Sequence, residues 1–277
     1  MIKLGLTVYG TPDARIEDTI ELAYELRLDT IDLHLKGLRR DRDYLQHIRL
    51  LCLRRGLPIG YLGAGSFVGT EEEMKDRVMQ GKEEVNLTAF LGAQMLRVFA
   101  RHPWPDTREE QEALWGPMIE RFRILSDYAA EKGVIVGLQN HDRSGFAMTA
   151  DQVLRILRET DRKNFTFIMD TGQWLGAIGA HPRGQFDPRV DLYRDYLERT
   201  VPFASCVRAK IYKIDSGREE FLDYERIVGI LQAAGFNGNL SIVVEHQGTQ
   251  FDDTEALKRA VAHLRAVIAA SYAVERT

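Results

Sequence analysis

The sequence predicts a single α/β domain built as a parallel (β/α)8 TIM barrel. Eight short runs rich in apolar and β-branched residues alternate with eight longer segments whose apolar residues recur at helical spacing. The 277 residues are about the length that one such barrel requires. An open doubly wound sheet is the rival, but no G-x-G-x-x-G motif follows the first run, where the sequence reads GLTVYGTPD. The alternation therefore favours a closed barrel.

The first half of the chain contains four predicted strand–helix units. The strands are IKLGLTV, TIDLHL, PIGYLG and MLRVF, at 2–8, 30–35, 58–63 and 95–99. The helices that follow them cover 16–26, 43–53, 71–93 and 108–131. Segments such as IEDTIELAYEL carry apolar residues three and four positions apart, which is typical of an amphipathic helix. The glycine in RRGLPIG is a typical helix stop before the third strand.

The second half repeats the pattern. The predicted strands are VIVGLQ, FTFIMD, SCVRAKIY and LSIVVE, at 134–139, 165–170, 205–212 and 240–245. The predicted helices cover 150–160, 188–202, 222–234 and 253–271. The glycines in EKGVIVG and AAGFNGNL again precede strands. Because no proline-rich linker or low-complexity tract divides the chain, we expect one domain over 1–277.

Composition and charge argue against several classes of protein. A hydrophobic fraction of 44% is enough for a sizeable core, and the net charge of −4 gives no electrostatic basis for binding nucleic acid. No apolar run reaches the ~18 residues of a membrane span, and the start MIKLGLTVYG is too short and too interrupted for a signal peptide. Cys52 and Cys206 lie far apart and fit a reducing compartment. We therefore expect a cytoplasmic protein that binds neither membrane nor nucleic acid.

The stretch FTFIMDTGQ at 165–173 places a carboxylate, Asp170, at the end of a hydrophobic strand. A charge there is costly unless it is solvated, paired or bound to a metal. In TIM barrels the active site lies at the carboxyl ends of the strands, on the loops that lead into the helices. Asp170 is therefore expected to face the mouth of the barrel, opposite a positive partner.

Polar residues also stand near the ends of the neighbouring strands. Because alternate residues of a strand point to the same side, four adjacent strands are expected to offer polar side chains at similar heights. These are Gln139, Asp170, Arg208 and Glu245. The second, fourth, fifth and seventh strands add further candidates, namely His34, Arg97, His141 and Lys210. Taken singly, each residue is as consistent with a solvated strand end or a rim ion pair as with a functional site. Gln139, Asp170, Arg208 and Glu245 together favour a site.

Several motifs carry a resemblance to a known family. The series GLQNH, IMDTGQ, VRAKIYKID and GREEFLDYERIVGILQAAGFNGNLSIVVE resembles the xylose isomerase-like TIM barrels. That superfamily includes sugar epimerases, keto-sugar and hydroxypyruvate isomerases, inosose dehydratases and an abasic-site endonuclease. The endonuclease branch needs a histidine-rich cluster for several zinc ions, and the strand ends of this chain supply few histidines. The resemblance is specific for the superfamily and does not identify a substrate.

The resemblance implies a particular set of site residues. In the isomerases and epimerases of the superfamily a divalent metal is held by a Glu, an Asp, a His and a second Glu from strands five to eight. The two glutamates also exchange protons with the carbon next to the sugar carbonyl. Asp170 and Glu245 match this pattern, whereas Gln139 stands for the first glutamate and Arg208 for the histidine. Gln173 replaces a further histidine three residues after the aspartate.

These departures leave two accounts of the site open. In the first, Mn²⁺, Mg²⁺ or Zn²⁺ is held weakly by Asp170, Glu245 and Gln139, with His141 or water completing the shell. In the second, Arg208 takes the place of the metal. A guanidinium has no free lone pair with which to bind a metal ion, but it always carries a positive charge. Arg208 would then pair with Asp170 and Glu245 and polarise a substrate carbonyl or carboxylate.

The predicted activity is proton abstraction next to a carbonyl of a sugar, keto-sugar or polyol, which gives isomerisation, epimerisation or elimination. Glu245 is the candidate base, Asp170 belongs to the same catalytic group, and Lys210 or His141 would supply the second proton-transfer function. The expected substrate contacts are Gln139, Arg208, Gln173, His34, Arg97 and Trp174. A catalytically silent relative that binds a sugar or an acid is the alternative. Members of the family often form oligomers, so a homo-oligomer is a further expectation.

Overall fold

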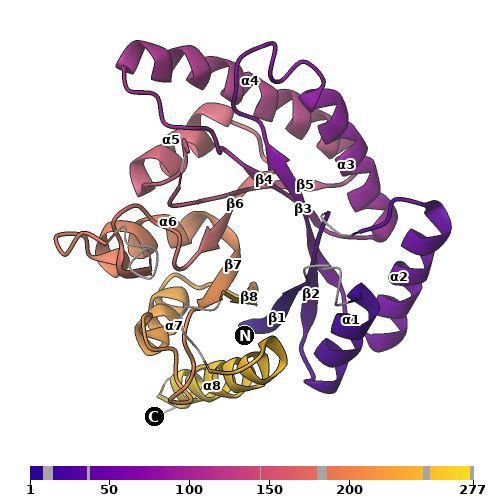
Figure 1. Cartoon of the computed structure of the whole chain (residues 1–277), viewed down its shortest axis with the longest axis vertical. Helices are drawn as coiled ribbons and strands as arrows, with labels where there is room; N and C mark the ends of the chain where they lie inside the picture. Colours follow the sequence, from indigo (N-terminus) through magenta and orange to yellow (C-terminus); the bar gives the residue numbers. More distant parts are fainter. Residues whose placement is uncertain (9–14, 36–37, 144, 180–185, 246–249, 275–277) are drawn as a thin grey trace.

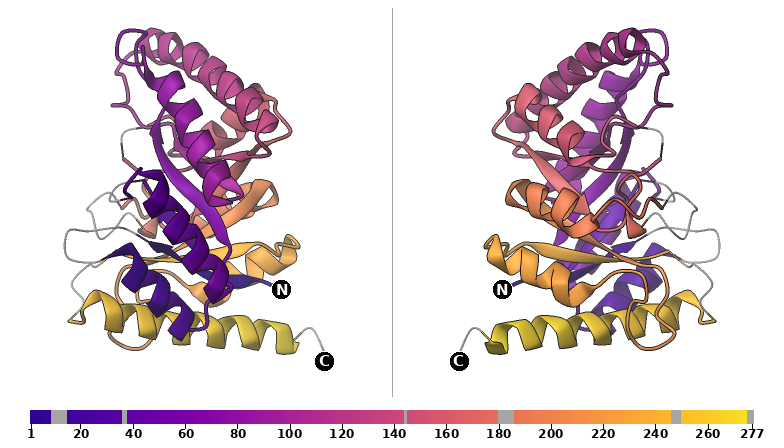
Figure 2. Two further views of the ribbon diagram at one scale, coloured as in Figure 1. Left: turned by 90° about the vertical axis from the view of Figure 1, so that its right-hand side faces the viewer. Right: turned by 90° about the vertical axis from the view of Figure 1, so that its left-hand side faces the viewer.

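Eight parallel strands form a closed barrel in which they follow one another in sequence order (Figure 1). The structure is a computed structural model that describes residues 1–8, 15–35, 38–143, 145–179, 186–245 and 250–274. β1 pairs with β2 on one side and with β8 on the other, which closes the sheet. Helices surround the barrel, and α8 packs on α7 and β8 along one side (Figure 2). The predicted (β/α)8 TIM barrel is confirmed.

The elements follow the predicted order. The strands are β1 (Lys3–Val8), β2 (Thr30–His34), β3 (Ile59–Ser66), β4 (Met95–Phe99), β5 (Ile135–Gln139), β6 (Phe165–Asp170), β7 (Ala204–Ile211) and β8 (Asn239–Val244). The helices are α1 (Ile16–Glu25), α2 (Arg42–Arg55), α3 (Arg77–Leu91), α4 (Arg108–Glu131), α5 (Ala150–Thr160), α6 (Glu198–Thr200), α7 (Tyr224–Ala233) and α8 (Asp253–Val274). None of the helices in these described ranges is long and apolar enough to cross a membrane.

Local sequence signals explain where several helices begin and end. Thr107 and Thr149 each form a capping box with the residue three positions later, which satisfies amide groups at the starts of α4 and α5. Asp41 accepts the Tyr44 N–H at the start of α2. Gly56, the predicted helix stop in RRGLPIG, ends α2 in the left-handed conformation with φ of 64°.

Two predicted helices differ from the structure. The helix expected over 71–93 begins only at Arg77, because Thr70 and Glu73 exchange hydrogen bonds with each other's backbone N–H and form a separate turn. The helix expected over 188–202 is a π-helical segment, Leu192–Leu197, followed by α6 and a 3-10 turn at Val201–Phe203. Asp191 accepts the N–H groups of Tyr193 and Arg194 and so sets its start, and Pro202 lacks the N–H that a continuing helix needs.

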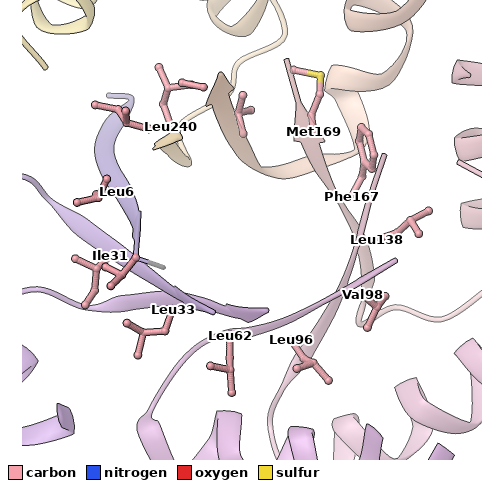
Figure 3. Packing of buried hydrophobic residues seen from close by; sticks show 14 of the residues in the cluster. Leu6, Ile31, Leu33, Leu62, Leu96, Val98, Leu138, Phe167, Met169 and Leu240 are labelled. Atoms are coloured by element: carbon pink, nitrogen blue, oxygen red, sulfur yellow. The ribbon is translucent and has the colours of Figure 1, made fainter. Parts of the chain in front are cut away.

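The apolar core lies between the barrel and the helices. Outward side chains of the strands form this layer, and Leu33, Leu62, Leu96 and Leu138 are among those labelled in Figure 3. A much smaller apolar cluster fills the barrel itself: Tyr61, Met95, Ile168 and Cys206. Gly137 makes room for it, because a Cβ there would lie 2.7 Å from Cδ1 of Ile168. Most other buried inward positions are polar, and they build the site.

Candidate functional site

A cluster of buried polar side chains points into the barrel. Each is no more than 5% exposed, and all come from strands, namely Thr7, Asp32, Tyr61, Arg97, Gln139, Asp170, Arg208, Lys210 and Ser241. Strand alternation explains this, since the residues between them belong to the outer apolar core. Buried polar groups at this density need partners, and the contacts below supply them.

Asp170 and Arg208 form an ion pair at the centre of this cluster. The two residues are direct register partners on β6 and β7, and Nε of Arg208 lies 3.2 Å from Oδ2 of Asp170. Nη1 of Arg208 donates to the Tyr61 hydroxyl and, at 3.4 Å, to Oγ1 of Thr7. Thr7 Oγ1 in turn lies 2.9 Å from the Tyr61 hydroxyl oxygen and 3.3 Å from Oγ of Ser241. The structure thus gives Asp170 the positive partner that the sequence predicted.

Lys210 and Glu245 form a second ion pair nearer the mouth. Nζ of Lys210 lies 2.8 Å from Oε2 of Glu245 and 3.8 Å from Oδ2 of Asp170. The Lys210 side chain is 3% exposed and the Glu245 side chain 35%, so the Glu245 carboxylate is the acidic group of this cluster that solvent reaches. Lys210 therefore links the buried carboxylate to the accessible one.

The expectation that Arg208 pairs with both carboxylates needs correction. The ion pair of Glu245 is made with Lys210. The register explains the difference, because Arg208 stands opposite Ser241, whereas Lys210 stands opposite Val243, closer to the end of β8. Lys210 is therefore the residue that contacts Glu245.

Gln139 connects the cluster to β4. Its Oε1 accepts a hydrogen bond of 2.7 Å from Nη1 of Arg97, and its Nε2 donates to Oδ2 of Asp170 at 3.2 Å and to Oε1 of Gln173 at 3.3 Å. Asn140 donates to the backbone oxygens of Asp170 and Gln173 and accepts the Asp170 N–H. The Asn140 side chain thus stabilises the turn after β6, and this turn places Gln173 beside Gln139.

The two predicted histidines, His141 and His34, lie near the ends of β5 and β2. His141 lies two residues after the end of β5, where Nδ1 accepts the Arg143 N–H and the ring stands edge-on to Phe99 at 5.9 Å. His34 is half-buried at the end of β2. For both histidines substrate contact or catalysis stays a prediction.

Trp174 lies away from the barrel interior. It is fully buried and stacks on Tyr196 with ring centroids 4.9 Å apart, close to Phe167 in the outer core. The turn after Asp170 directs this ring outward, toward the helices. The expectation that Trp174 contacts substrate is therefore withdrawn.

Sequence reasoning assigned no role to several members of the network. Tyr61 was assigned to an apolar strand, although its position within PIGYLG allows an inward ring, and Thr7 and Ser241 are inward-facing hydroxyls of β1 and β8. Asp32 is fully buried on β2, and its Oδ1 accepts the Tyr61 N–H at 3.0 Å. Strand alternation was the available signal for all four, since each lies at an inward position.

Asp32 makes the stability of the fold depend on pH. Burial raises the pKa of Asp32 from 3.8 to about 6, against the opposing effects of hydrogen bonds from Ser241 and the Tyr61 N–H. The folded state therefore binds this proton more tightly than the unfolded chain, so the Asp32 contribution to stability falls as pH rises from about 4 to about 6 and is level above that range. The shift corresponds to about 3 kcal/mol.

Asp32→Asn is expected to remove this contribution. As pH rises from about 4 to about 7, the free energy of unfolding of wild type should fall relative to that of the variant by about 3 kcal/mol. Urea denaturation of both proteins at several pH values measures this change in the difference. Burial raises the pKa of Glu219 to about 7 as well, but that group is present in both proteins and cancels in the difference. A difference that does not change with pH would contradict the assignment.

The side-chain oxygens that could serve as metal ligands in this site do not fit a divalent metal. Oδ2 of Asp170 pairs with Arg208, Oε2 of Glu245 pairs with Lys210, and Oε1 of Gln139 accepts from Arg97. The cationic partners have no lone pair with which to complete a coordination shell. Across the part of the chain that the structure describes, no three His, Cys, Asp or Glu side chains are grouped to hold a metal ion.

Fold and site together define a TIM barrel with a polar cluster at the carboxyl ends of its strands. The family described as xylose isomerase-like TIM barrel matches residues 18–267, and the chain belongs to that family. The family indicated by the sequence motifs is thus confirmed.

Proteins similar to this chain include sugar enzymes. An inosose dehydratase of Geobacillus thermodenitrificans (strain NG80-2) is 25% identical over 139 residues, and this alignment spans 46% of this chain and 46% of that relative. A 3-keto-D-glucoside 4-epimerase from E. coli is 17% identical with a TM-score of 0.74, covering 96% of this chain and 100% of that one. An L-ribulose 3-epimerase is 18% identical with a TM-score of 0.76, covering 100% and 96%. The structural matches are evidence of the shared fold.

Proposed function

We propose that this protein is a sugar, keto-sugar or polyol isomerase, epimerase or lyase that acts by proton transfer at the carbon next to a carbonyl. The observation that carries the proposal is the contact between Lys210 and the accessible carboxylate of Glu245, beside the buried carboxylate of Asp170. Family membership and the sugar enzymes among the similar proteins support the substrate class.

Glu245 would be the base. Its carboxylate takes the proton, the electron pair of the broken C–H bond forms a C=C bond, and the carbonyl oxygen receives the negative charge. The ammonium of Lys210, 2.8 Å from Glu245, would stabilise that oxygen, and the guanidinium of Arg208, which pairs with Asp170, would add a second positive charge. Lys210 or His141 would deliver the second proton, since the Gln139 amide cannot act as a base.

The fate of the enolate sets the reaction type. A proton returned to the opposite face of the same carbon gives an epimer. A proton delivered to the former carbonyl carbon, with the proton of the adjacent hydroxyl moving to the former carbonyl oxygen, gives an isomer. A proton given to a β-hydroxyl releases water and leaves an unsaturated product. The remaining inward side chains would hold the hydroxyl groups of a small sugar-like substrate; these are Arg97, Gln139, Gln173 and His34. The homo-oligomer expected from the family stays an expectation.

Solvent deuterium uptake tests this function. The protein is incubated in D₂O with keto-sugars, inososes and keto-acids, and the carbon next to each carbonyl is followed by NMR and mass spectrometry. At least one compound is expected to exchange, and the exchange should require Glu245. Binding of a compound without exchange at any carbon across the panel would instead favour the catalytically silent relative.

A further inference from the structure

We propose that Arg208 and Lys210 together replace a divalent metal, so that the site works with two fixed side-chain cations around Asp170. The proposal rests on the proposed function for its chemistry. Both cationic groups approach the same carboxylate oxygen, since Nε of Arg208 lies 3.2 Å and Nζ of Lys210 3.8 Å from Oδ2 of Asp170. Two single charges thus surround the carboxylate where the family pattern places one doubly charged ion.

The guanidinium is fixed in position. Arg208 is 2% exposed and donates to Tyr61 and Thr7 on one side while it pairs with Asp170 on the other. Its guanidinium carbon lies 5.9 Å from the centre of the Tyr61 ring, which is itself fully buried. Arg208 is therefore part of the packed interior.

Moving Arg208 aside would be costly. A guanidinium displaced toward the buried apolar cluster of Tyr61, Met95, Ile168 and Cys206 would lose its hydrogen bonds. A metal entering the site would have to separate Arg208 from Asp170 and Lys210 from Glu245. It would then lie beside two cations, and like charges in a buried site repel strongly.

Arg208 and Lys210 each take over one role of the metal ion. Arg208 is the buried cation that pairs with Asp170, and Lys210 is the cation that also reaches the accessible carboxylate of Glu245. A metal stabilises an oxyanion by its charge, and an ammonium does so by charge together with N–H donation. The arrangement therefore provides oxyanion stabilisation without a metal.

Manganese binding tests the proposal without any need for turnover. Wild-type protein, purified without chelator, is titrated with MnCl₂, and free Mn²⁺ is followed by electron paramagnetic resonance. We expect no stoichiometric binding by wild type. The double variant Gln139→Glu, Arg208→His restores the family's ligand types and should bind Mn²⁺ at least about 100-fold more tightly than wild type.

Gln139→Glu alone is the matched control, because it adds the carboxylate but keeps Arg208, and it should bind Mn²⁺ no better than wild type. One equivalent of Mn²⁺ bound by wild type would overturn the proposal, even if the double variant fails to fold. Equal binding by a folded double variant and wild type would also overturn it. Deuterium exchange by a metal-binding wild type would leave the proposed function standing while this inference fails.

Discussion

Glu245→Gln is expected to reduce the rate of deuterium exchange and of turnover by about 10²- to 10⁴-fold, the usual contribution of a positioned general base. The glutamine has nearly the same shape, but its amide does not accept a proton at neutral pH. The change also removes the anionic partner that lies 2.8 Å from Nζ of Lys210. The measurement is the exchange rate per enzyme with whichever compound of the panel exchanges in wild type.

Glu220→Gln is the matched control for this variant. Glu220 forms an ion pair of 3.0 Å with Lys213 in the segment that follows β7, outside the polar cluster, and its side chain is 30% exposed. Loss of this pair should change activity by less than about twofold, because exposed ion pairs contribute little. Full activity in Glu245→Gln would exclude Glu245 as the base and direct attention to His141.

The inward face of each strand could be predicted from the sequence because alternation is a local property. Asp170, Arg208 and Lys210 lie inside the barrel as expected, since counting along one strand needs no knowledge of its neighbours. The ends of most elements were predictable for the same reason, from local signals such as Gly56 and the capping threonines.

The pairing between strands could not be predicted in this way. Whether Glu245 meets Arg208 or Lys210 depends on the register of β7 against β8, which no residue count within one strand reveals. Tyr61 was counted as an apolar strand residue, and its role emerges only when the Thr7 hydroxyl of β1 and the Arg208 guanidinium of β7 lie beside it. Trp174 follows Asp170 closely in sequence, but the turn held by Asn140 sends it outward.

Arg208→Met is expected to lower the free energy of unfolding by about 3–5 kcal/mol, because it leaves the buried carboxylate of Asp170 without its guanidinium partner. Methionine replaces much of the apolar stem of the arginine, so most of the loss comes from the uncompensated charge. Lys210, 3.8 Å from Oδ2 of Asp170, provides partial compensation and places the effect toward the lower end. Urea denaturation followed by circular dichroism measures the change.

Asp170→Asn in the same chain separates charge from packing. An asparagine there is neutral, and its amide oxygen still accepts the Gly172 N–H that Oδ1 of Asp170 accepts at 3.1 Å. The double variant Arg208→Met, Asp170→Asn should therefore be more stable than Arg208→Met alone, and the two changes should be strongly non-additive. Arg189→Met is the surface control: Arg189 pairs with Asp187 at 2.7 Å, its side chain is 88% exposed, and its loss should cost less than about 1 kcal/mol. Additive changes in the double variant would mean that the Arg208 charge does not stabilise the Asp170 carboxylate, because a buried ion pair that matters must couple its two members.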